Sequence, residues 1–373
     1  MTGKVLIFGA GGRVGLQISA ELISRGLEVA MVDLLDPPAL AQRAARLRID
    51  ARLSRTGSPG ALSVYGGVDV LDGGALRRVL EMQRPDLVIN YAIPITWDAT
   101  KQLPNYSRVS AAGLGAFTPI QVLSPLMVGQ AMADLGLAVP FMVGNLPDIT
   151  VPILAGIAAS GSVVSPACGA GNVGLIEAAV REVAATELGR SPSEVQVHLV
   201  AHHIHWVAPR EPGYRNDAPF LLRVVSGGED VTSSLGDPRA FLNRAINACY
   251  EPGAAFSSTT GLLASRVALA LLDRGGPARA MHVPAPGGLP GGYPVTIAGG
   301  SIEPALPEDW SLAAAVRAME QAQQRDGVAQ IDPDGTVHFT AEARAILREE
   351  LDCQLPQSMA PGVIHTVAAE QVA

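Results

Sequence analysis

The first part of the chain alternates short, wholly apolar runs with longer stretches in which apolar residues recur at helical spacing. Residues 4–8 (KVLIF) lead into a group of glycines, and residues 13–25 then place Val14, Ile18 and Leu22 on one face before Gly26. A second apolar run follows at residues 27–32. Runs of this length predict strands buried on both faces, and the spacing between them predicts an amphipathic helix.

The same alternation continues to about residue 150. Apolar runs at residues 85–92 and 140–145 predict two more strands, and helix-like stretches precede both. Strands that alternate with helices predict a parallel sheet joined by right-handed crossovers. We therefore predict an α/β fold that begins with a Rossmann domain, a doubly wound parallel sheet, over residues 1–150.

The alternation weakens in the second half. A helix is predicted at residues 174–189, a strand at 194–206, a hairpin within 287–307, and a closing helix at 340–352 followed by a mobile tail. These mixed elements predict an α+β substrate lobe over residues 151–373. The boundary is expected between residues 148 and 165, where no linker composition locates it further.

Residues 149–176 contain no charged side chain and are long enough to span a bilayer. Pro152, Pro166 and several glycines would leave backbone groups unsatisfied in lipid. We expect a buried segment of a soluble core instead.

Charge and cysteine content restrict the partners. The 373 residues carry a formal net charge of −8, which disfavours nucleic acid and anionic membranes, because both bind basic surfaces. A small-molecule substrate is expected. Cys168, Cys249 and Cys353 are scattered and odd in number, so no disulfide framework is predicted, and the cytoplasm is the expected compartment.

The glycines after the first predicted strand have the spacing of a dinucleotide-binding turn. Gly9, Gly12 and Gly15 form one register and Gly11 allows a second, between a strand and a helix whose amino end attracts phosphate. Asp33 ends the next strand, where its carboxylate would bind the adenosine ribose and repel a 2′-phosphate, which favours NAD over NADP. The residues expected around NAD are Gly9, Gly11, Gly12, Arg13, Val14, Gly15, Asp33, Asp69, Tyr91, Ala92 and Asn145.

Parts of this half resemble the short-chain dehydrogenases, which use a Tyr-x-x-x-Lys pair. The chain has two lysines, Lys4 and Lys101, and the residue four positions before Lys101 is Trp97. That mechanism is therefore excluded.

Four later segments resemble the lactate and malate dehydrogenase superfamily in order and spacing: residues 143–150, 188–206, 257–272 and 287–307. The resemblance implies a homodimer or homotetramer in which His203 exchanges a proton with the substrate alcohol and Asn145 lies near the nicotinamide. Arg108 is the nearest match to the family's loop arginine. Histidine suits the role because it titrates near neutrality.

Two positions depart from the superfamily pattern. The aspartate that would orient the histidine falls on Ile176, and the arginine that would bind a substrate carboxylate falls on Ala179. The substrate is therefore not expected to be a simple 2-hydroxy acid. His202, Glu177 and Asp217 are candidates to replace the aspartate.

The related NAD-dependent glycosidases suggest another use of the histidines. His203-x-x-Trp206 resembles their metal-binding motif, but Gly174 stands where they have a cysteine, and Cys168 lies six residues earlier. We expect no metal; the alternative is a site built from His203 and His205 with Cys168 or Asp217. On a strand, His203 and His205 would share one face and His202 the other.

The sequence thus predicts an NAD-dependent oxidoreductase acting on a secondary alcohol or carbonyl, with His203 as general acid/base and with Asn145, His202 and Arg108 near it. A loop at residues 210–220 could close over the substrate. Two alternatives stay open: a redox-assisted lyase, epimerase or glycosidase with bound NAD and a divalent metal, and a non-catalytic dinucleotide sensor.

Overall fold

A six-stranded parallel sheet forms the centre of the N-terminal half in the computed structural model, which describes residues 3–53, 59–95, 97–103, 105–251 and 254–372. The strand order is β3-β2-β1-β4-β5-β6, the doubly wound order of a Rossmann fold. The α/β fold predicted from the sequence is therefore confirmed. The strands are β1 (Lys4–Phe8), β2 (Glu28–Val32), β3 (Leu62–Tyr65), β4 (Leu87–Asn90), β5 (Phe141–Val143) and β6 (Cys168–Gly169).

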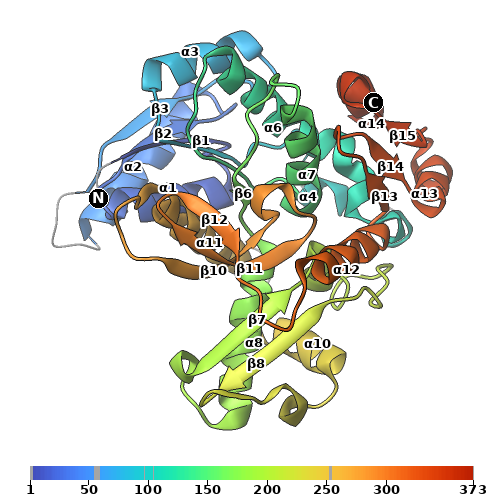
Figure 1. The fold of residues 1–373 in the computed structure, drawn as a ribbon. Helices are drawn as coiled ribbons and strands as arrows, with labels where there is room; N and C mark the ends of the chain where they lie inside the picture. The colour runs from blue at the N-terminus through green and yellow to red at the C-terminus, as the bar shows by residue number, and fades with distance from the viewer. Residues whose placement is uncertain (1–2, 54–58, 96, 104, 252–253, 373) are drawn as a thin grey trace.

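Helices cover both faces of this sheet (Figure 1). The strands are wholly apolar because neither face meets water: four of the five residues of β1, and all of β4 and β5, are buried. The helices of this half are α1 (Arg13–Ser24), α2 (Pro37–Leu53), α3 (Gly73–Gln83), α4 (Trp97–Thr100), α5 (Tyr106–Val109), α6 (Thr118–Asp134) and α7 (Pro147–Ala158).

The second half contains three small antiparallel sheets and further helices. The sheets are β7 (Val195–Val200) with β8 (Leu221–Ser226) and β9 (Glu229–Asp230); β10 (Arg279–Pro284) with β11 (Gly292–Ala298) and β12 (Ser301–Pro304); and β13 (Val328–Ile331) with β14 (Val337–Phe339) and β15 (Ser358–Met359). The helices are α8 (Asn172–Leu188), α9 (His203–Val207), α10 (Pro238–Cys249), α11 (Ala254–Leu272), α12 (Leu312–Gln324), α13 (Ala341–Leu351) and α14 (Ile364–Val372).

Short 3₁₀ helices connect several of these elements. They are η1 (Ser110–Ala112), η2 (Leu114–Phe117), η3 (Pro192–Glu194), η4 (Thr232–Leu235), η5 (Pro286–Gly288) and η6 (Pro361–Val363). Of these, η1 and η2 matter for the site, because they approach the segment after α12.

The strand predicted at residues 194–206 is wrong in its second part. β7 ends at Val200, Ala201 still exchanges backbone hydrogen bonds with Gly292, and His202 then caps the short helix α9. The strand ends there because the side chains of His202 and His205 satisfy backbone amides at the helix start. The three histidines therefore lie on a strand end and a helical turn, not on alternating faces of one strand.

The chain also returns to the first domain at its carboxyl end. β6 joins the parallel sheet beyond the predicted boundary at residue 150, and α14 packs against α6. The end of the chain is thus an ordered helix, which contradicts the predicted mobile tail. It is ordered because Ile364, Val367 and Ala368 bury their side chains in a core shared with α6.

One helix is long and apolar enough to cross a membrane by length and composition alone, within the described residues. It is the stretch Ala255–Leu272 of α11, of which 56% is buried inside the molecule. α11 packs along α1, as a core helix does. Tyr106–Ala112 and Leu114–Asp134, bent by 87°, pass the same test only as a pair.

Candidate active site

The glycine turn lies between β1 and α1, and its glycines differ in what surrounds them. A side-chain carbon on Gly9 would lie 2.5 Å from the Ala92 amide nitrogen, and one on Gly15 would lie 2.3 Å from the Gly9 carbonyl oxygen. Gly9 also has a φ of +76°. Gly12, by contrast, is exposed and has no closer neighbour than 3.4 Å. Close packing therefore requires glycine at positions 9 and 15, while Gly12 leaves the amino end of α1 open to a ligand.

Asp33 is held against this turn. Its Oδ2 accepts a hydrogen bond from the Gly11 amide at 2.7 Å, and its Oδ1 accepts one from the Leu35 amide at 3.0 Å. The Arg43 guanidinium, which the sequence did not single out, donates to the Gly11 carbonyl. The carboxylate thus sits at the end of β2, beside the amino end of α1, where a ribose would need it.

Asn145 follows β5 and joins the ends of two strands. Its Nδ2 donates to the Ala92 carbonyl at 2.6 Å, and its Oδ1 accepts from Asn90 Nδ2 at 2.9 Å. Tyr91, beside them, donates its hydroxyl to the Ala170 carbonyl at 3.2 Å. Asn145, Tyr91 and Ala92 are therefore brought together at the carboxyl edge of the sheet, whereas Asp69 is exposed and accepts from the Leu71 amide.

The three histidines of the 202–205 segment are all buried, but their ring nitrogens differ. His205 accepts the His202 amide at Nδ1 (3.0 Å) and lies 3.1 Å from the Ala218 carbonyl through Nε2, so both of its nitrogens are used. His202 Nδ1 accepts a long hydrogen bond from the Ile204 amide, at 3.4 Å. Across the described residues, His202 Nε2 and both ring nitrogens of His203 have no hydrogen-bond partner.

Asp326, which follows α12, faces His203. Its Oδ2 lies 3.4 Å from His203 Nε2, and its Oδ1 accepts from the Leu114 amide at 2.9 Å. Gly113 and Gly115 allow this approach, because a side-chain carbon on either would lie within 2.5 Å of the Asp326 backbone. The sequence analysis missed Asp326, since nothing in its neighbourhood marks it as a site residue.

Asp148 is the second carboxylate of the site, in the first turn of α7 and three residues after Asn145. It is fully buried, and neither of its oxygens has a hydrogen-bond partner among the described groups. Burial raises its pKa to about 7, and the amides of Asp148 and His203, which lie nearby without meeting hydrogen-bond geometry, lower it to a smaller extent. Its place beside the His203 backbone puts the histidines next to the carboxyl end of β5.

Burial shifts the pKa values of the histidines and carboxyl groups of this site in the directions that favour their neutral forms. Desolvation lowers the pKa of His203 to about 3, with a smaller contribution from His205, and lowers the pKa of His202 well below its usual range. Desolvation likewise raises the pKa of Asp326 well above its usual range, and the nearby charge of Asp148 adds to this. The imidazoles are therefore neutral near pH 7 and free to accept a proton.

Ile176 and Ala179 are both buried, and Ile176 lies in an apolar cluster, so α8 contributes no polar group at the positions expected for the aspartate and arginine. Glu177 instead pairs with Arg181 on its own helix, and Asp217 pairs with Arg325 at 2.9 Å. Of the candidates to replace the missing aspartate, the structure thus places His202 beside His203 and the other two elsewhere.

The arginines considered from the sequence also lie elsewhere. Arg108 is 76% exposed at its side chain and pairs with Glu350 at 3.2 Å, so the structure does not bring it to the histidines. Arg210 stacks on Tyr250, with its guanidinium carbon 3.8 Å from the ring centroid. Arg215 pairs with Asp217 at the surface.

The loop after α9 is held against the segment of residues 97–112. Lys101 and Tyr106 both contact the Glu211 carboxylate, and Ser110 donates to the Pro212 carbonyl at 2.6 Å. The Tyr214 hydroxyl of this loop is buried without a hydrogen-bond partner among the described atoms. Burial raises its pKa, and the nearby charge of Asp326 adds to this. The loop therefore covers the site rather than lying as a free turn.

The alternative metal set of His203, His205 and Cys168 is not brought together. Both nitrogens of His205 are used by backbone groups, and Cys168 lies in β6, where burial raises the pKa of its thiol to about 12. The groups that could hold an ion are His202, His203 and Asp326, whose ligand atoms lie within 4.8 Å of one another.

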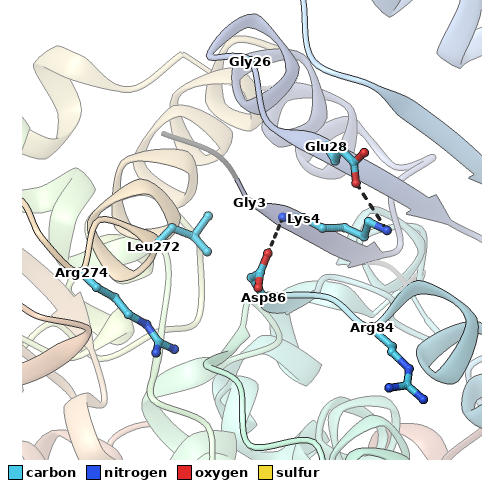
Figure 2. Close-up of a pocket in the computed structure, with 8 residues that line it drawn as sticks. All are labelled: Gly3, Lys4, Gly26, Glu28, Arg84, Asp86, Leu272 and Arg274. Carbon is cyan, nitrogen blue, oxygen red and sulfur yellow. Dashed lines mark hydrogen bonds and ion pairs between the residues drawn. The ribbon is translucent and has the colours of Figure 1, made fainter.

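A separate open pocket of about 720 Å³ lies at the opposite end of the sheet (Figure 2). Lys4 at the start of β1 pairs with Glu28 at 3.4 Å, and its amide donates to Asp86 at 2.8 Å. Because the glycine turn follows the other end of β1, this pocket is not the cofactor cleft.

Comparison with known proteins supports the fold. Residues 5–113 match the profile of the NAD dependent epimerase/dehydratase family, and no curated protein matches the chain. The structure resembles malate dehydrogenase of Cryptosporidium parvum, with a TM-score of 0.55 and 19% identity over 87% of this chain and 99% of that one.

Two lactate dehydrogenases are similar to the same extent. The enzyme of Eimeria maxima, solved with NADH and oxamate, has a TM-score of 0.59 and 17% identity over 87% of this chain and 91% of that one. The minor L-lactate dehydrogenase of Enterococcus mundtii has a TM-score of 0.55 and 17% identity over 86% and 95%. The chain therefore has the fold of the malate and lactate dehydrogenases.

Proposed function

We propose that this protein is an NAD-dependent oxidoreductase that interconverts a secondary alcohol and a carbonyl group on a small molecule. The observation that carries the proposal is the buried, unpartnered imidazole of His203, 3.4 Å from the Asp326 carboxylate. It lies beside the turn of Asn145 and Asp148, at the carboxyl edge of the sheet, where doubly wound proteins bind ligands.

The glycine turn supplies the cofactor site. Gly12 leaves the amino end of α1 open to a pyrophosphate, and Asp33 can accept hydrogen bonds from a ribose. The family profile over residues 5–113 and the NADH-bound lactate dehydrogenase neighbour support NAD as the nucleotide. When bound, NAD accepts or returns the hydride.

His203 would move the accompanying proton. In the oxidation direction, its neutral ring takes the proton of the substrate hydroxyl as the carbon–hydrogen bond transfers a hydride. Asp326 then stabilises the imidazolium, and the Leu114 amide keeps the carboxylate in place. In the reduction direction the same proton returns to the carbonyl oxygen.

The substrate is expected to lack a carboxylate next to the reacting carbon. Asp148 and Asp326 are both buried at the site, and neither a neutral carboxyl group nor a carboxylate offers a positive charge to pair with an anionic group there. Ala179 cannot bind one, and Arg108 pairs with Glu350 at the surface. Neutral polyols, sugars and hydroxyketones fit these charges better than lactate or malate.

The test is a glutamine substitution at His203. Turnover of an alcohol found by screening for NADH formation should fall about 10²–10⁴-fold in His203→Gln, because the proton acceptor is lost. NAD binding should stay unchanged. His338→Gln is the matched control, since His338 pairs with Asp332 at 2.7 Å away from the site. Turnover at the wild-type rate in His203→Gln would refute the proposal.

A second function rests on the number of acid–base groups at the site. Two histidines and two carboxylates are buried together, more than one proton transfer needs. A redox-assisted lyase, epimerase or glycosidase would use such groups on an oxidised intermediate and then restore NAD. Product formed with no net change in NADH absorbance would distinguish this function from the first.

We further propose that the protein works in the cytoplasm as a homo-oligomer, which the three scattered cysteines and the likeness to dehydrogenases favour. Sedimentation of the purified chain would test the oligomeric part.

A further inference from the structure

The buried cluster of His202, His203 and Asp326 has more unsatisfied polar atoms than a single acid–base pair requires. His202 and Asp326 are 0% exposed and His203 is 1% exposed. His202 Nε2, both nitrogens of His203 and Asp326 Oδ2 lack hydrogen-bond partners among the residues that the structure describes. Buried polar atoms are ordinarily paired, so this group calls for a ligand.

We propose that this cluster binds one divalent transition-metal ion through a ring nitrogen of each histidine and Oδ2 of Asp326. Two imidazoles and one carboxylate are donors that Zn²⁺, Co²⁺, Mn²⁺ and Fe²⁺ accept. The three ligand atoms lie within 4.8 Å of one another.

The geometry is close to what an ion needs. Ligands at about 2.0–2.2 Å from one ion lie roughly 3.4 Å apart in a tetrahedral site, so the widest pair of the cluster must contract by up to about 1.4 Å. The long 3.4 Å contact between the Ile204 amide and His202 Nδ1 is the hydrogen bond that binding would give up. The Leu114 amide already orients the carboxylate through its other oxygen.

The charge balance also favours a cation. Asp326 and the neighbouring Asp148 are both fully buried, and no lysine or arginine lies within ion-pair distance of either in the described ranges. In their ionised forms, two such carboxylates without a cation are unfavourable. A divalent ion with two neutral histidines would bring the site to zero net charge.

A bound ion would occupy His203. The ring nitrogen that ligates a metal has no lone pair left for a substrate proton, so we expect the ion to inhibit the proposed hydride transfer. This consequence rests on the proposed function, whereas the binding itself does not.

Binding is tested with Co²⁺ on the full chain without a polyhistidine tag, after removal of metals with a chelator and long incubation for entry to a buried site. The wild type should bind one equivalent per chain, with visible absorption bands typical of nitrogen and oxygen ligands. His202→Gln and Asp326→Asn should each weaken binding at least ~10²-fold. His338→Gln, at the surface His–Asp pair, should bind as the wild type does.

Three outcomes decide the matter. No stoichiometric absorption with folded wild-type protein, or equal binding by wild type and His202→Gln, would overturn the site. If a variant fails to fold, the melting temperature of the wild type replaces the comparison of variants. It should rise with Co²⁺ and not with Mg²⁺. Full activity of the Co²⁺-loaded protein would overturn only the inhibition.

Discussion

At the residue scale, the environments of neighbouring histidines decide what each can do. His205 gives both ring nitrogens to backbone groups and therefore stabilises the start of α9. In His203, Nε2 faces Asp326 at 3.4 Å, and neither ring nitrogen has a hydrogen-bond partner among the described residues. The same residue type, two positions apart, is a structural group in one case and, in the proposed function, the proton acceptor in the other. The difference lies in the contacts and not in the residue.

Asp33 should decide between NAD and NADP by its charge. Asp33→Asn keeps an oxygen that can accept from the Gly11 amide but removes the charge that repels a 2′-phosphate. We expect the preference for NAD over NADP to fall about tenfold, measured as the ratio of the two dissociation constants, since about 1.4 kcal/mol corresponds to a factor of ten. Asp36→Asn, at an exposed carboxylate that caps α2, should leave the ratio unchanged. An unchanged ratio in Asp33→Asn would show that Asp33 does not approach the ribose.

His282 should make the folded state sensitive to acid. Desolvation, with a smaller effect of Arg181, lowers its pKa to about 3, while the unfolded chain keeps a value near 6.5. The unfolded state therefore binds the proton first, and this stability is present above about pH 6.5 and is lost as the pH falls towards 3. Its Nε2 also accepts the Leu199 amide at 3.2 Å, which protonation would prevent.

The measurement is urea unfolding at about pH 7.5 and about pH 5. Because His282 is partly exposed, we expect the wild type to lose on the order of 1 kcal/mol more than His282→Gln between these two pH values. His365→Gln, at an exposed histidine, should behave as the wild type. Equal losses in the wild type and His282→Gln would contradict the prediction.

At the element scale, the fold depends on where each helix begins. α1 starts directly after the glycine turn and lies against β1 because Gly15 has no side chain. α9 starts because His202 and His205 satisfy the first amides, which ends β7 earlier than its apolar pattern predicts. The starts of α1 and α9 therefore position both the expected phosphate site and the histidine of the proposed function.

The glycine turn allows a direct comparison of two alanine substitutions. Gly15→Ala would put a carbon 2.3 Å from the Gly9 carbonyl oxygen, so we expect a loss of about 1–3 kcal/mol in the free energy of unfolding. Gly12→Ala meets nothing closer than 3.4 Å and should cost about 0.5 kcal/mol, because glycine is preferred over alanine at the N-cap of a helix. It should still weaken NAD binding, because its methyl group faces the open terminus. Denaturant unfolding and NAD titration of both variants check this, and equal stabilities would contradict it.

At the scale of the whole molecule, the end of the chain completes the first domain. α14 packs against α6, α13 packs against α5 and η1, and the core there includes residues from both ends of the chain. The turn after α12 delivers Asp326 to His203 in the same region. The site is therefore assembled only when the C-terminal part has packed.

The contribution of α14 can be measured at its first residue. Ile364 is fully buried, so Ile364→Ala should reduce the free energy of unfolding by about 2–4 kcal/mol through lost burial and a cavity. The neighbouring Val363 is 44% exposed, and Val363→Ala should change it by less than about 0.5 kcal/mol. Equal effects of the two substitutions would show that α14 does not stabilise the domain.

The sequence by itself determined the parallel sheet, the glycine turn and the position of Asp33. Each depends on the spacing of residues that are close together along the chain. It also identified His203, Asn145 and the loss of polar groups at Ile176 and Ala179. Only the tertiary structure decided which carboxylates face His203, where β7 ends and that the last helix packs. Asp326 and Asp148 reach the histidines through contacts between distant segments, and burial there raises the pKa of both carboxyl groups, so no local pattern could mark them.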